Sequence, residues 1–417
     1  MRICLIGYRG NPYSGGQGIY LYFLTRELAR LGHRVEVIVG PPYPRPLEDW
    51  AVVHKIPNLN LWGKYRGDWL PGAKPFSLYR PWNLFDFAAT RLRFFPEPFS
   101  FSFRAFALLR RLLATRRFDL LHDIQTLGYG TLAMRGFGMP IVTTVHHPLT
   151  IDRREAFDAD RGFEEKFHTA VFFPVTMQGF VIRRLSHVIT ASKAGKQAIE
   201  EDFGVPPERI SIVRNGLDTD FFHNLGLRRA ANTLLFVGNT DDVKKGAIHL
   251  LQALRHLPGR VKLRIVDDPF PTKTLIAREV ERMGLAGRVV FTGKLGEEAL
   301  REEYGRCTLL VQPSLYEGFG LPAAEAAACE TPVVATDVGA VAEVVTPQTG
   351  VLAPPAEPQK LAGTIAGLLG DAPRRKALGR AGRRRMVERF SWPGTAERTL
   401  GVYQKVLAEA RRAGGAP

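Results

Sequence analysis

Two successive series of short apolar runs, each run followed by a helix-like segment, constrain the fold of this chain most strongly. The first series begins with residues 3–6 and 35–39, and the second begins with residues 234–237 and 261–266. Apolar runs of this length are typical of parallel strands that are buried on both faces. Their alternation with helices predicts an α/β fold with doubly wound parallel sheets, and two series predict two facing Rossmann-like domains.

Length and composition agree with this organisation. A chain of 417 residues is too long for one ordinary core, and 45% hydrophobic with 24% charged residues is typical of a soluble globular protein. The sequence has no apolar run long enough to span a bilayer, and its start reads as a strand rather than a signal peptide. Cys4, Cys307 and Cys329 lie in apolar settings, so we expect reduced core thiols and a cytoplasmic protein.

A formal net charge of +16 calls for an anionic partner. Residues 62–117 contain eleven Lys or Arg against three Asp or Glu, together with fourteen aromatic residues. These aromatic side chains could belong to the core, or basic and aromatic groups could face an anionic membrane or a lipid acceptor. Nucleic acid is the least supported partner, because no recognised binding module is present.

The stretch from Glu317 to Glu325 follows one apolar run and precedes another. Pro322 suits the first turn of a helix, while Gly318 and Gly320 let the backbone approach a ligand closely. Free amides at a helix start favour a phosphate, and the two flanking carboxylates can accept hydrogen bonds from hydroxyls. This pattern predicts a site for a nucleotide sugar; the alternative is a plain helix start with a solvated glutamate.

This spacing resembles the signature of retaining glycosyltransferases of family 4, which have the two-domain GT-B architecture. The resemblance implies that Glu317 lies at the donor sugar and that Glu325 holds the ribose hydroxyls. It further implies that the intervening backbone contacts sugar and diphosphate, through Gly318, Phe319, Gly320 and Leu321.

The resemblance also implies a domain division. Residues 1–216 with 392–417 would form the acceptor-binding domain, and the C-terminal helix would cross back to it. Residues 232–391 would form the donor-binding domain, and residues 217–231 the linker.

A glycine loop, Ser14–Gly18, follows the first predicted strand and opens the first helix. It can be a plain strand-to-helix turn, or it can present amides to a ligand. Its resemblance to the family's N-terminal signature places Gly16 beside the donor phosphates and Gly15 and Gln17 on the acceptor side.

Histidines follow two further predicted strands, at the edge where ligands collect in parallel sheets. Thr144-Val145-His146 resembles the family's Thr-x-His, so His146 would approach the donor sugar; its neighbour His147 is an acceptor-side candidate. His122 and Asp123 form either an acceptor-side pair or a cap on the next helix.

A cationic motif follows the first strand of the second series. Lys245-Gly246 matches the family's Lys-Gly, which implies that Lys245 neutralises the diphosphate, with Lys244 beside it. Asn239 stands where the family commonly has an arginine. Either Lys244 or Arg214 replaces this cation, or the donor is bound less tightly.

The resemblance implies transfer of a hexosyl unit from a nucleotide diphosphate sugar to an acceptor hydroxyl, with retained configuration. His146, Lys245 and Glu317 would be the catalytic residues. We expect no cofactor and no metal, since no metal-ligand spacing is found. The acceptor could be lipid-linked, which would place the protein on the inner face of the membrane. A sugar-nucleotide epimerase or phosphorylase of the same fold, or a non-catalytic basic binding protein, are the alternatives.

Overall fold

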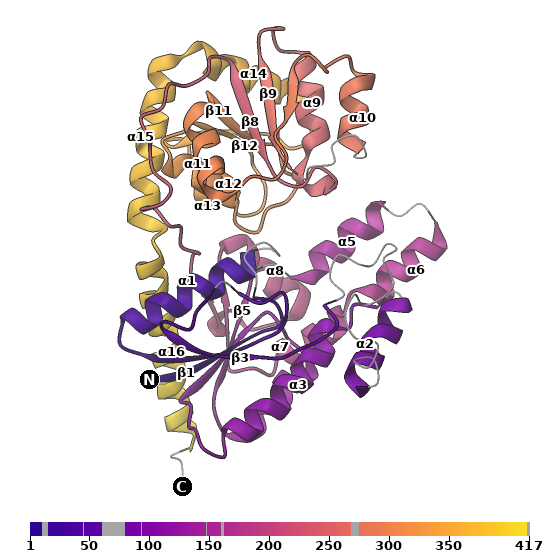
Figure 1. Ribbon diagram of the computed structural model, residues 1–417, viewed down its shortest axis with the longest axis vertical. Coiled ribbons are helices and arrows are strands. Elements are labelled where there is room, and N and C mark those ends of the chain that lie inside the picture. The colour runs from indigo at the N-terminus through magenta and orange to yellow at the C-terminus, as the bar shows by residue number, and fades with distance from the viewer. Residues whose placement is uncertain are drawn as a thin grey trace. The chain divides into compact units, whose positions relative to one another are not determined.

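Each of the two predicted domains is present as a unit with its own parallel sheet in the computed structural model (Figure 1). The structure describes residues 1–10, 16–44, 46–60, 80–92, 94–146, 148–159, 162–267 and 275–414. Unit 1 comprises Met1–Arg214 and Thr395–Pro417, and unit 2 comprises Asn215–Gly394. Residues 217–231, which the resemblance assigns to a linker, therefore lie within unit 2.

The sheet of unit 1 has seven parallel strands in the order β3-β2-β1-β4-β5-β6-β7. β1 pairs with β2 on one side, where Ile3 is opposite Val35, and with β4 on the other, where Ile3 is opposite Leu120. The strand order reverses between β1 and β4, which is the switch point at which such sheets bind ligands. The strands are β1 (Arg2–Gly7), β2 (Arg34–Val39), β3 (Ala51–Lys55), β4 (Leu120–Ile124), β5 (Ile141–Val145), β6 (His187–Thr190) and β7 (Ile210–Ile212).

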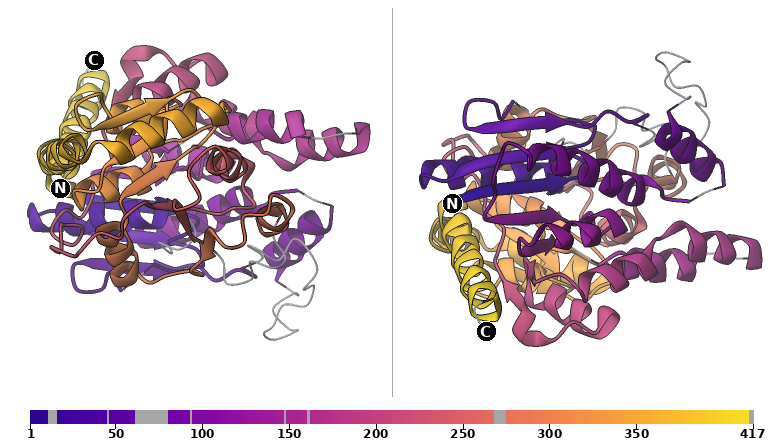
Figure 2. Two further views of the ribbon diagram at one scale, coloured as in Figure 1. Left: turned by 90° about the horizontal axis from the view of Figure 1, so that it is seen from above. Right: turned by 90° about the horizontal axis from the view of Figure 1, so that it is seen from below.

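Helices connect these strands, and a hairpin of two of them, α5 and α6, projects from the rest of unit 1 (Figure 2). The C-terminal helix α16 belongs to this unit from Thr395 onward, as the crossover expectation requires. The helices are α1 (Gly16–Arg30), α2 (Pro81–Arg91), α3 (Glu97–Leu112), α4 (Tyr129–Ala133), η3 (Met134–Phe137), α5 (Leu149–Ala159), α6 (Phe163–Phe172), α7 (Val175–Ile182), α8 (Lys193–Phe203), η4 (Pro207–Arg209) and α16 (Trp392–Gly414).

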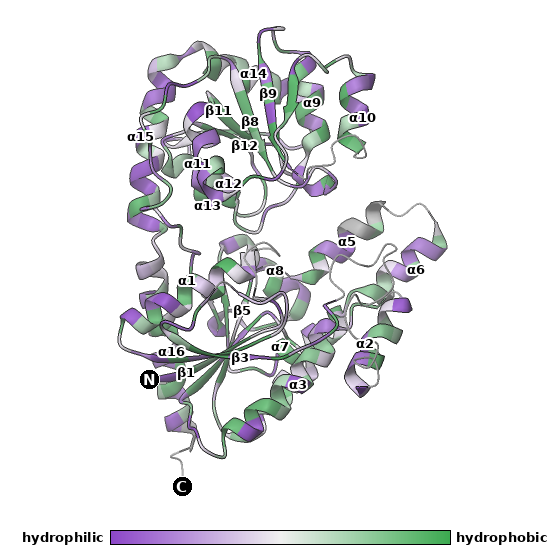
Figure 3. Cartoon of the chain, viewed as in Figure 1, coloured by the Kyte–Doolittle hydropathy of each residue, from purple (hydrophilic) through white to green (hydrophobic). Residues whose placement is uncertain are grey.

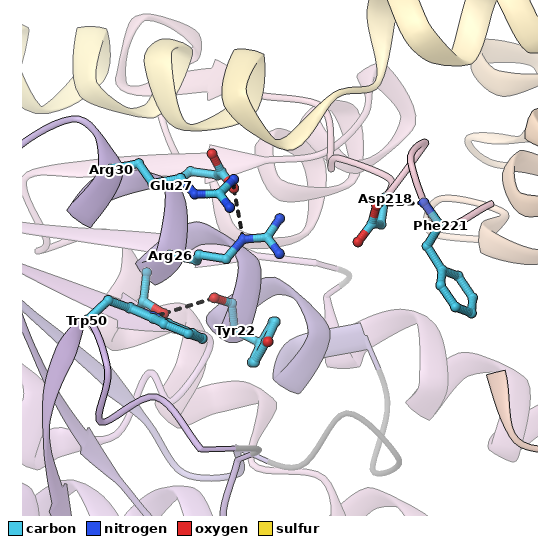
Figure 4. A network of polar contacts seen from close by, with 8 residues as sticks. Tyr22, Arg26, Glu27, Arg30, Trp50, Asp218 and Phe221 are labelled. Carbon is cyan, nitrogen blue, oxygen red and sulfur yellow. Dashed lines mark hydrogen bonds and ion pairs between the residues drawn. The ribbon is translucent and has the colours of Figure 1, made fainter. Parts of the chain in front are cut away.

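The first helix is held by polar contacts as well as by its apolar face (Figure 4). Glu27 is buried and accepts hydrogen bonds from Arg26 Nε at 2.9 Å and Arg30 Nη1 at 3.0 Å. Trp50 Nε1, just before β3, donates to Thr25 Oγ1 at 3.2 Å. The Glu27 contacts lie within α1, and the Trp50 contact ties the helix to the segment that enters β3.

The sheet of unit 2 has six parallel strands in the order β10-β9-β8-β11-β12-β13, with the switch point between β8 and β11. The strands are β8 (Thr233–Val237), β9 (Lys262–Val266), β10 (Val289–Phe291), β11 (Leu309–Gln312), β12 (Val333–Thr336) and β13 (Gly350–Ala353). The helices are η5 (Val243–Lys245), α9 (Ala247–Arg255), α10 (Leu275–Arg282), α11 (Glu297–Arg306), α12 (Leu321–Ala328), α13 (Val341–Val344), α14 (Pro358–Gly370) and α15 (Ala372–Arg389). Figure 3 shows that α15, which is rich in arginine, is mainly hydrophilic.

Buried side chains explain the cysteines and one structural arginine. All three cysteines are free and buried, as the sequence predicted, and burial raises the pKa of Cys307 and Cys329 to about 12. Arg229 donates from Nη1 to Cys307 O at 2.8 Å and from Nη2 to Glu330 O at 3.0 Å. One guanidinium therefore satisfies carbonyls just beyond both α11 and α12. Among the described residues, no helix is both long and apolar enough to cross a bilayer.

We predict that Tyr403→Phe destabilises unit 1. The Tyr403 hydroxyl on α16 lies 2.6 Å from Nδ1 of fully buried His122, whose Nε2 is 2.7 Å from Thr144 Oγ1. Removing the hydroxyl leaves a buried ring nitrogen without this partner, so the free energy of unfolding should fall by about 1–3 kcal/mol in urea denaturation. Tyr129→Phe, at a side chain that is 38% exposed, is the control and should change stability by less than about 0.5 kcal/mol. Equal stability of the two variants would show that the His122 contact contributes nothing.

Candidate functional site

The start of α12 is built around a left-handed backbone conformation, which glycine adopts without steric cost. Gly320 precedes the helix with φ +86° and ψ 49°, and Pro322 stands in the first turn. The Ala323 amide donates to Gln312 Oε1 at 3.1 Å, so the last residue of β11 fixes the helix start to the sheet. The motif therefore forms the strand–loop–helix connection that the sequence predicted.

Gln312 is a residue that sequence reasoning missed. Its side chain is 5% exposed, and its Nε2 is buried without a hydrogen-bond partner among the described residues. The available signal was a single polar residue at the end of an otherwise apolar run. A buried polar side chain there needs a hydrogen-bond partner from the connection that follows the strand.

Glu317 lies beside Lys245, although 72 residues separate them in the chain. Lys245 Nζ donates to Glu317 Oε1 at 2.8 Å, and Ser314 Oγ donates to the same oxygen at 2.9 Å. The carboxylate is largely buried, whereas 29% of the lysine side chain is exposed. An ammonium group has three donors, so Lys245 can contact an anion while it holds Glu317.

Two glycines allow these loops to come together. Gly246, directly after Lys245, has φ +66°, and a Cβ there would overlap the Pro313 carbonyl. Gly339 has φ +51°, and a Cβ there would overlap the Glu317 carbonyl, which accepts from the Ala340 amide at 2.9 Å. Backbone contact on both sides therefore determines where Glu317 lies.

Glu325 lies within α12 and is 8% exposed. Its Oε2 accepts a hydrogen bond of 2.7 Å from the hydroxyl of Tyr304, a fully buried residue of α11. Burial raises the pKa of Glu325 to about 7, and the hydrogen bond from Tyr304 offsets this only in part. Tyr304 is thus a second residue that the sequence did not reveal, because only the packing of α11 on α12 brings it to Glu325.

Side-chain hydrogen bonds hold the loop after β8, and one of them comes from Asp267, directly after β9. Exposed Asn239 accepts from the Asp241 amide at 2.9 Å through Oδ1, and Thr240 N donates to Asp267 Oδ2 at 2.7 Å. Asp242 Oδ1 accepts from the Lys244 amide at 3.1 Å and starts η5. Asn239 therefore structures the turn in which the family commonly has a cation.

The remaining residues of the motif follow from this arrangement. Gly318, Phe319 and Leu321 lie in the connection between Glu317 and α12. The ring of Phe319 lies 5.8 Å from that of Phe390, so this side chain packs against the core of unit 2.

In unit 1, His146 directly follows β5. Its ring lies 4.9 Å from that of Tyr20 in an edge-to-face contact, and its amide donates to Gln125 Oε1 at 2.8 Å. Gly16 and Gln17 are the first two residues of α1, and the roles assigned to them stay predictions. Gly15 and His147, two of the acceptor-side predictions, lie outside the described residues.

His122 and Asp123 are fully buried at the end of β4. Burial, with His146 adding to it, lowers the pKa of His122 to about 3, so its imidazole is neutral. Asp123 Oδ2 accepts from the Thr126 and Leu127 amides, each at 3.1 Å, and burial raises its pKa to about 6. The acceptor-side assignment of both residues stays a prediction.

Asp123 holds a backbone turn that orients His146. Gln125 and Leu127 have left-handed φ values of +50° and +49°, which are costly for residues other than glycine. The two amide contacts to Asp123 stabilise this turn, and Gln125 in turn binds the amide of His146. Asp123 therefore acts on His146 through Gln125.

Within the described ranges, no three His, Cys, Asp or Glu side chains are grouped as a metal site requires. The charges at the α12 start come instead from Lys245, Glu317 and the helix itself.

Comparison with known proteins decides the family. Residues 14–221 match the model described as Glycosyltransferase Family 4, and residues 218–385 match the model described as Glycosyl transferases group 1. The MMP alpha-(1->4)-mannosyltransferase of Mycolicibacterium hassiacum is 38% identical over 98% of this chain and 99% of that protein. The chain is a family 4 glycosyltransferase with the GT-B fold.

One further relative and two solved structures are less similar to this glycosyltransferase in sequence. The D-inositol 3-phosphate glycosyltransferase of Thermobispora bispora is 29% identical over 97% of this chain and 92% of that protein. The sucrose-phosphate synthase of Thermosynechococcus elongatus has the same fold, with a TM-score of 0.74, 23% identity, and coverage of 98% of this chain and 100% of that one. The Anabaena protein Alr3699/HepE in complex with UDP-glucose gives a TM-score of 0.69 at 19% identity, covering 97% and 100%.

We predict a pH-dependent stability that resides in Glu325. Its pKa is about 7 in the fold against 4.5 for the free side chain, so the protonated form is favoured by folding. That contribution is complete below about pH 4.5 and is lost as the pH rises to about 7. Between pH 5 and pH 8, the free energy of unfolding should therefore fall by about 1–3 kcal/mol more in the parent than in Glu325→Gln.

Urea denaturation at the two pH values measures this difference. Glu281→Gln, at an exposed position on α10, is the matched control and should follow the parent. A Glu325→Gln variant with the parental pH dependence would contradict the prediction.

Proposed function

We propose that unit 2 binds a nucleotide diphosphate sugar and that the protein transfers the hexosyl unit to an acceptor hydroxyl with retained anomeric configuration. The observation that carries this proposal is the contact of Lys245 with Glu317 in the loop that leads to α12. The cation comes from η5, after β8, and it meets the carboxylate and the helix start of the connection between β11 and α12. This combination suits a diphosphate attached to a hydroxyl-rich sugar.

Each group has a definite role in this proposal. Lys245 and the backbone from Gly318 to Leu321 stabilise the departing diphosphate. This electrostatic stabilisation makes the largest contribution to catalysis. Glu317 accepts hydrogen bonds from hydroxyls of the sugar. The bond from the anomeric carbon to the diphosphate breaks, the bond to the acceptor oxygen forms on the same face, and the acceptor proton goes to the diphosphate.

Glu325 is assigned to the ribose of the donor. Its ionised carboxylate can accept hydrogen bonds from two hydroxyls, and Tyr304 fixes the position of the second oxygen. Because the pKa of Glu325 lies near 7, ligand hydroxyls that favour the ionised form bind more weakly at acid pH.

The sugar and acceptor are proposed from the relatives. The name of the relative that is 38% identical favours a mannosyl unit and a carbohydrate hydroxyl. The Anabaena neighbour was solved with UDP-glucose, so glucosyl transfer is the second donor to test. The lipid-linked acceptor, the cytoplasmic location and independence from metal or cofactor stay predictions. For unit 1, we propose that His146 approaches the donor sugar, that Gly16 lies beside the donor phosphates and that Gln17 serves the acceptor side.

We predict that Lys245→Met lowers kcat by about 10²-fold or more, because it removes charge stabilisation from the leaving group. Glu325→Gln should mainly raise the KM for the donor. The assay incubates mannosyl and glucosyl donors with sugar acceptors, measures released nucleoside diphosphate, and reads the product anomer by NMR. Lys262→Met on β9 is the charge-matched control and should retain the parental rate.

Several results would count against this function. Parental turnover in Lys245→Met would remove the site assignment, and an inverted product would remove the retaining mechanism. Loss of activity in EDTA that a metal restores would remove metal independence. An altered nucleotide sugar formed without acceptor would indicate an epimerase, and phosphate-dependent sugar release would indicate a phosphorylase.

A further inference from the structure

Helix α2 is amphipathic in the reverse of the usual sense. Its polar side chains Asn83, Asp86 and Thr90 face the protein and are 4–7% exposed. Leu84 and Phe85 face outward and are 57% and 40% exposed. A surface helix normally buries its apolar stripe, so an outward apolar stripe marks a contact surface.

The reversal is fixed by specific contacts with α3. Arg104 donates from Nη2 to Asp86 Oδ2 at 2.6 Å and from Nη1 to Asn83 Oδ1 at 3.0 Å. The ring of Trp82 stacks on that of Phe103, 5.5 Å away and inclined by 11°. Rotating α2 to bury its apolar stripe would break the Arg104 hydrogen bonds. The polar side chains of α2 would gain no better partners in return.

The outward stripe continues into neighbouring helices. Phe85 lies 5.3 Å from Phe99, Phe99 lies 6.2 Å from Tyr129, and Tyr129 lies 5.9 Å from Phe180. Tyr129 and Phe180 are each 38% exposed. We call Trp82, Leu84, Phe85, Leu92, Tyr129 and Phe180 the aromatic surface; these residues belong to α2, the residue directly after it, α4 and α7, and Phe99 of α3 contacts Phe85 and Tyr129.

The exposed charged side chains of α2, α3 and the residues that flank them are all cationic among the described residues. In residues 80–92 and 94–117, the two carboxylates, Asp86 and Glu97, are buried, and they pair with Arg104 and Arg9. Arg184 lies 3.6 Å from the centre of the Phe180 ring, at the edge of the aromatic surface. The exposed arginines of the two ranges are Arg80, Arg91, Arg110, Arg111 and Arg117.

We propose that the aromatic surface docks this protein on an anionic lipid bilayer, with α2 lying in the interface. Trp and Phe rings suit the headgroup boundary, and nearby arginines are attracted by anionic lipids. The inference goes beyond sugar transfer, because it requires neither donor nor acceptor.

Other occupants fit the surface less well. A sugar chain would stack on the rings, but Leu84 and Leu92, the most exposed members at 57% and 66%, are aliphatic. A second copy in a twofold contact would bring the same exposed arginines together, which costs electrostatic energy.

Flotation of the full chain with vesicles tests the proposal. One set contains phosphatidylcholine alone, and the other contains equal parts phosphatidylcholine and phosphatidylglycerol. Binding should be at least about fivefold stronger to the anionic set, a change of the size expected for one or two interfacial arginines. Leu84→Ser with Phe85→Ser should abolish binding to both sets, and Arg80→Glu with Arg91→Glu should remove the preference for anionic lipid. Val387→Ser, at a side chain that is 45% exposed in unit 2, should bind as the parent does.

The same variants separate this proposal from the proposed function. Released nucleoside diphosphate with a water-soluble donor and acceptor should be unchanged in the α2 variants, and their thermal unfolding should match the parent. Equal binding of parent and Leu84→Ser/Phe85→Ser to anionic vesicles would overturn the proposal. An absence of vesicle binding by the parent would also overturn it. Oligosaccharide binding or dimer formation that the same variant abolishes would then identify the occupant of the surface.

Discussion

Burial of both faces of each parallel sheet is the constraint on which the rest of the structure depends. Strands such as β1 and β12 carry apolar side chains in both directions, so a polar group within the sheet is costly unless it is hydrogen-bonded, as His122 and Asp123 are in β4. Polar groups that must contact a ligand are therefore favoured at the connections that follow the strands. Lys245 follows β8, Glu317 follows β11 and His146 follows β5, which places every proposed reacting group on such a connection.

The connections differ in how far the sequence could predict them. Gly320 and Pro322 specify a helix start through their own backbone preferences, so this part of the site was evident from local pattern alone. The contact of Lys245 with Glu317 depends on two loops meeting, and the family resemblance implied only that both serve the donor. Tyr304 gave no local signal, and Gln312 gave only its polarity at the end of an apolar run, because the roles of both arise from the packing of neighbouring elements on α12. The buried face of α2 was harder still to predict, since its outward apolar stripe contradicts the rule by which apolar residues are assigned to the core.

Buried acids occur within helices and strands of both units. Asp86, Asp123 and Glu325 each have a pKa raised by burial, to about 6, 6 and 7. Each also holds a structural partner: Arg104, the turn after β4, and Tyr304. Hydrogen bonds therefore compensate much of the cost of burying these carboxyl groups and give each one a single orientation.

The glycines beside Lys245 and Glu317 have a consequence for how this site can diversify. Because side chains at Gly246 and Gly339 would overlap backbone carbonyls, the spacing of the two loops has almost no room to drift through substitution. Asn239, by contrast, is exposed and bonds only within its own turn among the contacts described. New donor preferences would therefore arise more readily by substitution at Asn239, whereas the positions of Lys245 and Glu317 would be retained.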